Sequence, residues 1–173
     1  MRAPPQGMAA DPLLLLEERA RHLARPLKQQ PAGAALEVIA FTLAGELYAI
    51  EARYVVAVSP LLHLSALPGA EPPLHGVTGW RGELLTVLDL RRVLGLSVAA
   101  LDDLNQVLVL GEARAAFGLL VNAVQVLASV PLSSIHPLPE GRTMARPYLR
   151  GMTSEAMLLL DAKALLREWA DVV

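Results

Sequence analysis

The chain has 173 residues, of which 54% are hydrophobic, and a formal net charge of −2. This size and apolar content suffice for one domain, or two small intimate ones, and exclude disorder for most of the chain. Cysteine is absent, which excludes disulfides, thiolate nucleophiles and sulfur-ligated metals, and the arginines form no basic stripe, which argues against a nucleic-acid partner.

Residues 1–35 are expected to form a helix and a flexible tether. Asp11 can cap the helix, Pro26 ends it, and the aperiodic stretch that follows is typical of a linker. No run approaches about 18 apolar residues, and no signal-peptide pattern is present. We therefore expect a cytoplasmic protein without direct membrane insertion, whose folded domain covers residues 36–173.

Short apolar runs separated by turn residues predict strands in the first half of this domain, at 36–43, 47–50 and 55–64. Two further strands, 77–80 and 84–88, flank Arg81-Gly82. Because glycine permits a positive φ there, these two strands are predicted to form a hairpin.

The second half repeats this organisation. Apolar runs predict strands at 107–110, 117–121 and 124–130, followed by a hairpin of 152–154 with 157–160. One helical face then collects apolar residues, which predicts a closing helix packed on the sheets: Ala162, Leu165, Leu166 and Trp169.

An internal repeat runs through both halves. The segment GVTGWRGELLTVLDLRRVLGL (76–96) returns in looser form as GMTSEAMLLLDAKALL (151–166), and Tyr48 to Val55 match Phe117 to Val124 at the same spacing. Each unit is too small for a large core of its own, so the repeat predicts two subdomains that share an interface.

Candidate catalytic and metal sites are weak. Asp89 and Asp161 stand at equivalent helix starts, which favours capping over a carboxylate pair. The four histidines show no ligand spacing, the serines lack a nucleophile elbow, and GVTGWRG lies in a hairpin and should not cradle phosphate. We expect no cofactor and no metal. A module that binds a small ligand between the subdomains, and a hydrolase built on His136 and a nearby serine, stay open as alternatives.

At these residues the chain resembles the CheW family, the coupling proteins of bacterial chemosensory arrays. The family signature reads here as Gly76-Val77, Gly79-Trp80-Arg81-Gly82, the strand 84–88 and Asp89-Leu90-Arg91. Further matches are FTLAGELYAI (41–50), FGLLVNAVQVL (117–127) and MLLLDAKALL near the end, so that the resemblance covers about 36–170.

The resemblance implies a mainly β fold of two intertwined five-stranded SH3-like barrels with short helices and a C-terminal helix. It also implies a non-enzymatic adaptor that joins the cytoplasmic tip of a methyl-accepting chemoreceptor to the regulatory domain of a CheA-type histidine kinase. The residues that would border the receptor-binding surface, carried over from the family motif, are Val55, Gly76, Arg81, Gly82, Val121 and Asn122.

Three positions depart from the family pattern. Gly79 stands where asparagine is favoured, Asn122 where aspartate is common, and Ala57 where a glutamate often pairs with the motif arginine. Arg81 is therefore expected to lack its usual charged neighbour. Three outcomes stay open: coupling is weakened, it is specialised to an unusual receptor as in a degenerate CheW-like protein with a specialised partner, or it is kept through a carboxylate supplied by the partner.

Overall fold

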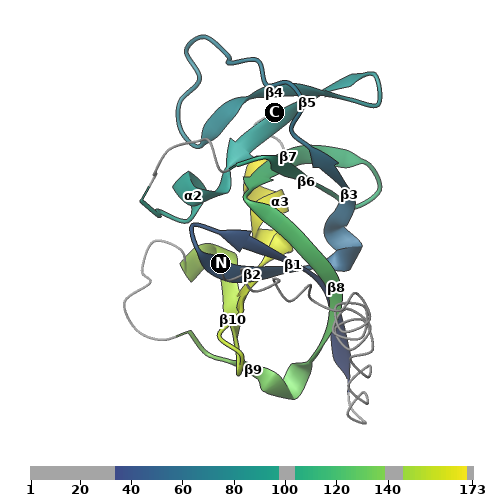
Figure 1. The fold of residues 1–173 in the computed structure, drawn as a ribbon, viewed down its shortest axis with the longest axis vertical. Helices are drawn as coiled ribbons and strands as arrows, with labels where there is room; N and C mark the ends of the chain where they lie inside the picture. The colour runs from purple at the N-terminus through teal and green to yellow at the C-terminus, as the bar shows by residue number, and fades with distance from the viewer. Residues whose placement is uncertain (1–33, 98–103, 139–145, 171–173) are drawn as a thin grey trace, which may run out of the picture. The chain divides into compact units, whose positions relative to one another are not determined.

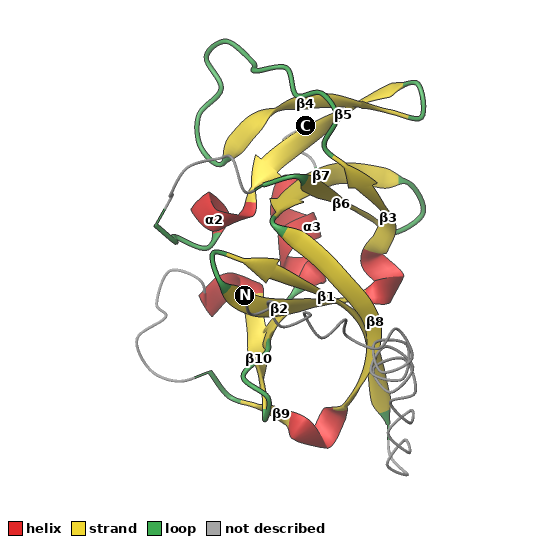
Figure 2. Ribbon diagram, viewed as in Figure 1, coloured by secondary structure: helices red, strands yellow, loops and turns green. Residues whose placement is uncertain are grey.

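The computed structural model describes residues 34–97, 104–138 and 146–170. They form two β-sheets with short helices (Figure 1 and Figure 2). The helix and tether predicted for 1–35 lie outside the described residues, apart from the last two positions of that range. No helix within the described residues is long and apolar enough to cross a membrane.

The first sheet has six strands. In spatial order they are β8 (Ala123–Pro131), β1 (Ala35–Leu43), β2 (Glu46–Glu51), β11 (Leu158–Leu160), β10 (Leu149–Thr153) and β9 (Ile135–His136). Neighbouring strands are antiparallel, except for the parallel pair β2 and β11. The sequence does not predict β9, because a strand of two residues beside prolines shows no alternation. It raises the number of strands from the expected five to six.

The second sheet has the expected five strands. Their order is β3 (Val55–Pro60), β6 (Gln106–Gly111), β7 (Ala115–Val121), β5 (Glu83–Asp89) and β4 (Leu74–Trp80). Only β5 and β7 pair in parallel. After β3 the chain returns to the opposite edge of the sheet, where Ser65 pairs with Val77 of β4. The two edges of the sheet are thereby connected.

The two sheets are interlocked by two chain crossings. The chain leaves the first sheet after β2 through the 3-10 turn η1 (Ala52–Tyr54), builds the whole second sheet, and returns from β7 to β8 through Asn122. The two crossings are the segments whose sequences repeat. The prediction of a mainly β fold with two intertwined units is confirmed.

Equivalent contacts support the repeat. Ala49 lies beside Leu159 in one parallel pair of strands, and the equivalent residue Gly118 lies beside Val87 in the other. The opening glycines of the two copies are both closely covered by a facing carbonyl. A Cβ on Gly76 would lie 2.4 Å from Ser65 O, and one on Gly151 would lie 2.6 Å from His136 O.

Both sheets contribute to a common hydrophobic core. In the first sheet the rings of Phe41 and Tyr48 stack with their centroids 5.8 Å apart, and both side chains belong to the same buried cluster as Leu108 and Leu119 of the second sheet. Burial of this apolar surface is the main stabilising term of the fold. The shared core is the interface that the repeat predicts.

The aspartates predicted as caps do begin helices. Asp89 precedes α2 (Leu90–Val93) and accepts a hydrogen bond from the Arg91 amide, while Asp161 precedes α3 (Ala162–Trp169) and accepts one from the Ala164 amide. The two sites differ in burial, since Asp89 is fully buried and Asp161 is not. Two more 3-10 turns, η3 (Leu132–Ser134) and η4 (Arg146–Tyr148), complete the described elements.

Candidate protein-interaction surface

The β4–β5 hairpin carries three of the predicted site residues. Arg81 and Gly82 form its two-residue turn with φ values of 51° and 85°. Two consecutive positive φ values match the tight turn that fits the twist of a hairpin, and glycine adopts the second without strain. The turn therefore holds Arg81 at a defined place at the end of the two strands.

Arg81 rests on an aromatic side chain. Its guanidinium lies 4.6 Å from the centroid of the Trp80 ring, within the range of a cation–π contact, and the residue is exposed. Among the described residues no carboxylate forms an ion pair with it. The indole thus orients the guanidinium, whose N–H donors stay available to a partner. This agrees with alanine at position 57, where the family often has a glutamate that pairs with the arginine.

An exposed leucine lies in the same hairpin, two residues after the turn. Leu84 is 80% exposed, although it belongs to a strand whose next five residues are buried. It stands opposite Gly79, and a side chain at position 79 would have open space around it. The departure from asparagine to glycine at this position therefore leaves Leu84 uncovered.

We define the hairpin patch as Trp80, Arg81, Leu84 and Leu62, which together cover both faces of the hairpin tip. Trp80 and the 76% exposed Leu62 share one face, whereas Leu84, opposite Gly79 in the register, extends from the other. Leu62 and Trp80 line the same small hollow between β3 and β4. The hollow has a volume of about 50 Å³, far below the several hundred Å³ of an ordinary small-molecule site. Large exposed apolar side chains around a fixed cation are typical of a surface that binds another protein.

The remaining predicted residues do not join this patch. Val55 pairs with Leu110, and Val121 pairs with Gln106, so these two valines stand at opposite ends of β6. At about 3.3 Å per residue the separation along the strand is about 13 Å. Val121 is fully buried, so it can influence a partner only by shaping β7.

Two more predicted residues hold the fold together at this point. Gly76 is buried against the Ser65 carbonyl. Asn122 uses its Oδ1 to accept a hydrogen bond of 2.9 Å from the Ala44 amide, and its own amide donates to Thr42 O. The neutral amide thus supplies the acceptor that a carboxylate would offer at this crossing. Whether any of the six predicted residues touches a partner stays a prediction.

The sequence reasoning missed an ionic cluster at the first crossing. The carboxylate of Glu51 is 5% exposed and forms ion pairs with Arg53, at 2.5 Å, and with Arg150 of β10. Glu51 and Arg150 are 99 positions apart, so no local pattern connects them. The only signal of this cluster in the sequence is a lone glutamate directly after the apolar run 47–50. A charge at the end of a buried strand requires a partner of opposite charge, but the sequence does not say which residue supplies it.

The histidine considered for catalysis lies beside a serine of the β10–β11 turn. His136 Nε2 lies 3.3 Å from Ser154 Oγ, and both residues are exposed. Within the described ranges no cluster of three histidine, aspartate or glutamate side chains is arranged to hold a metal ion.

Comparisons with known proteins agree with this architecture. The family model described as CheW-like domain matches residues 37–169. The chain is 30% identical to the chemotaxis protein CheW of Klebsiella aerogenes over 75% of this chain and 81% of that protein. It is 33% identical to protein FrzA of Myxococcus xanthus over 60% of this chain and 68% of that protein.

The fold is also similar to a solved structure. The crystal structure of the scaffolding protein TtCheW from Thermoanaerobacter tengcongensis superimposes with a TM-score of 0.64, covering 74% of this chain and 90% of that one. The sequences are 21% identical in this comparison, so the likeness concerns the fold.

Proposed function

Because the chain belongs to the family of CheW-like domains, we propose that it is a non-enzymatic adaptor of chemosensory signalling. It joins the cytoplasmic tip of a methyl-accepting chemoreceptor to the regulatory domain of a CheA-type histidine kinase. It acts in the cytoplasm, at membrane-associated receptor arrays. The family membership and the chemotaxis proteins among its relatives support this assignment.

The observation that carries the proposal is the hairpin patch. An interface needs apolar anchors that lose water on binding, and a few oriented polar groups that fix the register. Leu62 and Leu84 are anchors of this kind, and Arg81 is oriented by Trp80. In family members that pair this arginine internally, its charge is already neutralised, whereas here a carboxylate of the partner would pair with it.

The direct test is binding of the full chain to a purified kinase regulatory domain and to a receptor fragment. Co-elution in gel filtration, and a titration followed by fluorescence anisotropy of the labelled fragment, would measure both interactions. If neither fragment binds at about 50 µM, which corresponds to roughly 6 kcal/mol, the adaptor proposal fails.

Arg81→Glu is expected to weaken binding of the kinase domain or the receptor fragment, whichever the unchanged chain binds, at least about tenfold. The reason is that it places a like charge against the partner carboxylate. Arg81→Lys should have an intermediate effect, since lysine keeps the charge but loses the planar fork stacked on Trp80. Anisotropy titrations measure both. The melting temperature should change little, because Arg81 is exposed; a large loss of stability would make Arg81 a structural residue.

Leu84→Ser is expected to raise the dissociation constant about fivefold to tenfold, because it removes an apolar anchor. Stability should be nearly unchanged, since the side chain is 80% exposed. Leu127→Ser is the matched control, because Leu127 is 55% exposed but lies on β8 of the other sheet. Equal effects of the two substitutions would show that the hairpin patch is not the binding surface.

A further inference from the structure

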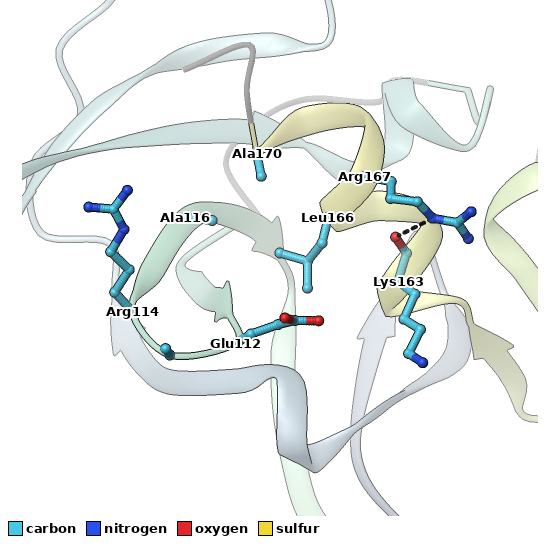
Figure 3. Close-up of a pocket in the computed structure, with 8 residues that line it drawn as sticks. Glu112, Arg114, Ala116, Lys163, Leu166, Arg167 and Ala170 are labelled. Carbon is cyan, nitrogen blue, oxygen red and sulfur yellow. Dashed lines mark hydrogen bonds between the residues drawn. The ribbon is translucent and has the colours of Figure 1, made fainter.

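A separate pocket lies between the β6–β7 turn and α3. Its volume is about 500 Å³, within the range of ordinary binding sites. The residues that line it include Glu112, Arg114, Ala116, Lys163, Leu166 and Arg167. Figure 3 shows Leu166 and the Glu112 carboxylate pointing into the space, with Lys163 and Arg167 along one side and Arg114 on the other.

One stripe of α3 faces this pocket. Lys163, Leu166, Arg167 and Ala170 follow the spacing i, i+3, i+4 and i+7, which places them on one helical face. The buried residues Ala162 and Leu165 lie on another face and join the core. Leu166, which is half-buried, packs at the edge of the same core, whereas Lys163 and Arg167 of the pocket stripe are exposed.

The pocket combines an apolar floor with excess positive charge. Ala116, Leu166 and Ala170 supply the floor, and three cationic side chains oppose the single carboxylate of Glu112. In the described part of the chain no ion pair joins Glu112 to any of the three cations. The Nε of Arg167 donates only a long bond of 3.4 Å to Lys163 O.

The two copies of the repeat use the corresponding cation in different ways. Arg91 and Lys163 each stand two positions after a capping aspartate. Arg91 is 3% exposed and binds Asp89, whereas Lys163 is exposed and lines the pocket. The second copy has therefore a free charge where the first has a buried ion pair.

We infer that this pocket binds an acidic segment of a further partner protein. An apolar side chain of that segment would cover Leu166 and Ala116, while its carboxylates would pair with Lys163 and Arg167. The excess positive charge of the lining favours a negatively charged ligand. The apolar floor favours a peptide segment that also carries an aliphatic side chain, rather than a small inorganic anion. None of the six residues predicted from the family motif lines this site.

The probe for the test is a fluorescein-labelled peptide that alternates leucine and glutamate, titrated with the full chain at low salt. A peptide with lysine in place of glutamate is the control. The leucine–glutamate peptide should bind, binding should weaken as salt rises, and the lysine peptide should not bind. Lys163→Gln with Arg167→Gln should weaken binding at least about tenfold.

Ser133→Glu with Ser154→Glu is the matched variant, because it also lowers the formal net charge by two but alters exposed residues that do not line the pocket. It should keep the affinity within about twofold. Absence of binding, or an equal loss in both double variants, would overturn the inference. The assay uses neither receptor nor kinase, so its outcome is independent of the adaptor proposal.

Discussion

Replacing Asp89 by alanine is expected to lower the free energy of unfolding by about 3–5 kcal/mol, because the change removes the buried carboxylate that binds the buried guanidinium of Arg91. Asp89 is fully buried and Arg91 is 3% exposed. One carboxylate oxygen of Asp89 accepts from the Arg91 amide and Nε, and the other accepts from Nη2 at 3.0 Å. The Asp89 amide donates to Pro73 O, and alanine can keep this backbone hydrogen bond, so the expected loss comes from the carboxylate.

The repeat supplies the matched control for this experiment. Asp161→Ala removes the equivalent cap of α3, but no buried arginine depends on it, so about 1 kcal/mol should be lost. The double variant Asp89→Ala with Arg91→Met should recover part of the loss, because it removes the buried charge as well. Urea unfolding of the full chain measures all three free energies. Equal losses for the two aspartates would refute the ionic explanation.

Asp89 and Asp161 show what can be predicted from the sequence alone. Both aspartates were predicted as caps from one pattern, an acid directly before an apolar helical repeat, and both predictions are confirmed. The pattern could not distinguish a buried ion pair from an exposed cap. That difference depends on which faces of α2 and α3 the sheets cover, and on arginine at position 91 against lysine at 163.

For the fold, local signals predicted most of the structure. The Arg81-Gly82 hairpin follows from turn chemistry, and the resemblance to the CheW family is confirmed by the family match over residues 37–169. The interlocking of the two sheets also agrees with the repeat. By contrast, β9 and the contact between Glu51 and Arg150 depend on partners distant in the sequence, which periodicity cannot detect.

For the candidate site, the sequence indicated the hairpin but not its surface. The run 84–88 reads as uniformly apolar, yet Leu84 is exposed and Leu85 is buried, because alternate residues of a strand face opposite sides. The empty position opposite Leu84 is visible only once the register pairs it with Gly79. The pocket at α3 needs the β6–β7 turn to lie beside the helix, which no spacing in the chain predicts.

Gly76→Ala is expected to lower the free energy of unfolding by about 1–3 kcal/mol, because the added methyl group has no space. Its Cβ would lie 2.4 Å from the Ser65 carbonyl oxygen, a backbone atom, and 3.3 Å from a methyl of Leu64. Ser65 and Val77 exchange two backbone hydrogen bonds of 2.9 Å at this place. Relief of the overlap would have to weaken these bonds, which connect the two edges of the second sheet.

Gly79→Ala is the control within the same strand, since its Cβ would meet nothing within 4 Å, and it should change stability by no more than about 0.5 kcal/mol. Gly151→Ala should behave like Gly76→Ala, because its Cβ would lie 2.6 Å from the His136 carbonyl oxygen in the other sheet. Urea unfolding of the three variants tests both the packing and the repeat. If Gly76→Ala is as stable as Gly79→Ala, close backbone contact is not the reason for glycine at this position, and a role at the partner surface becomes the better explanation.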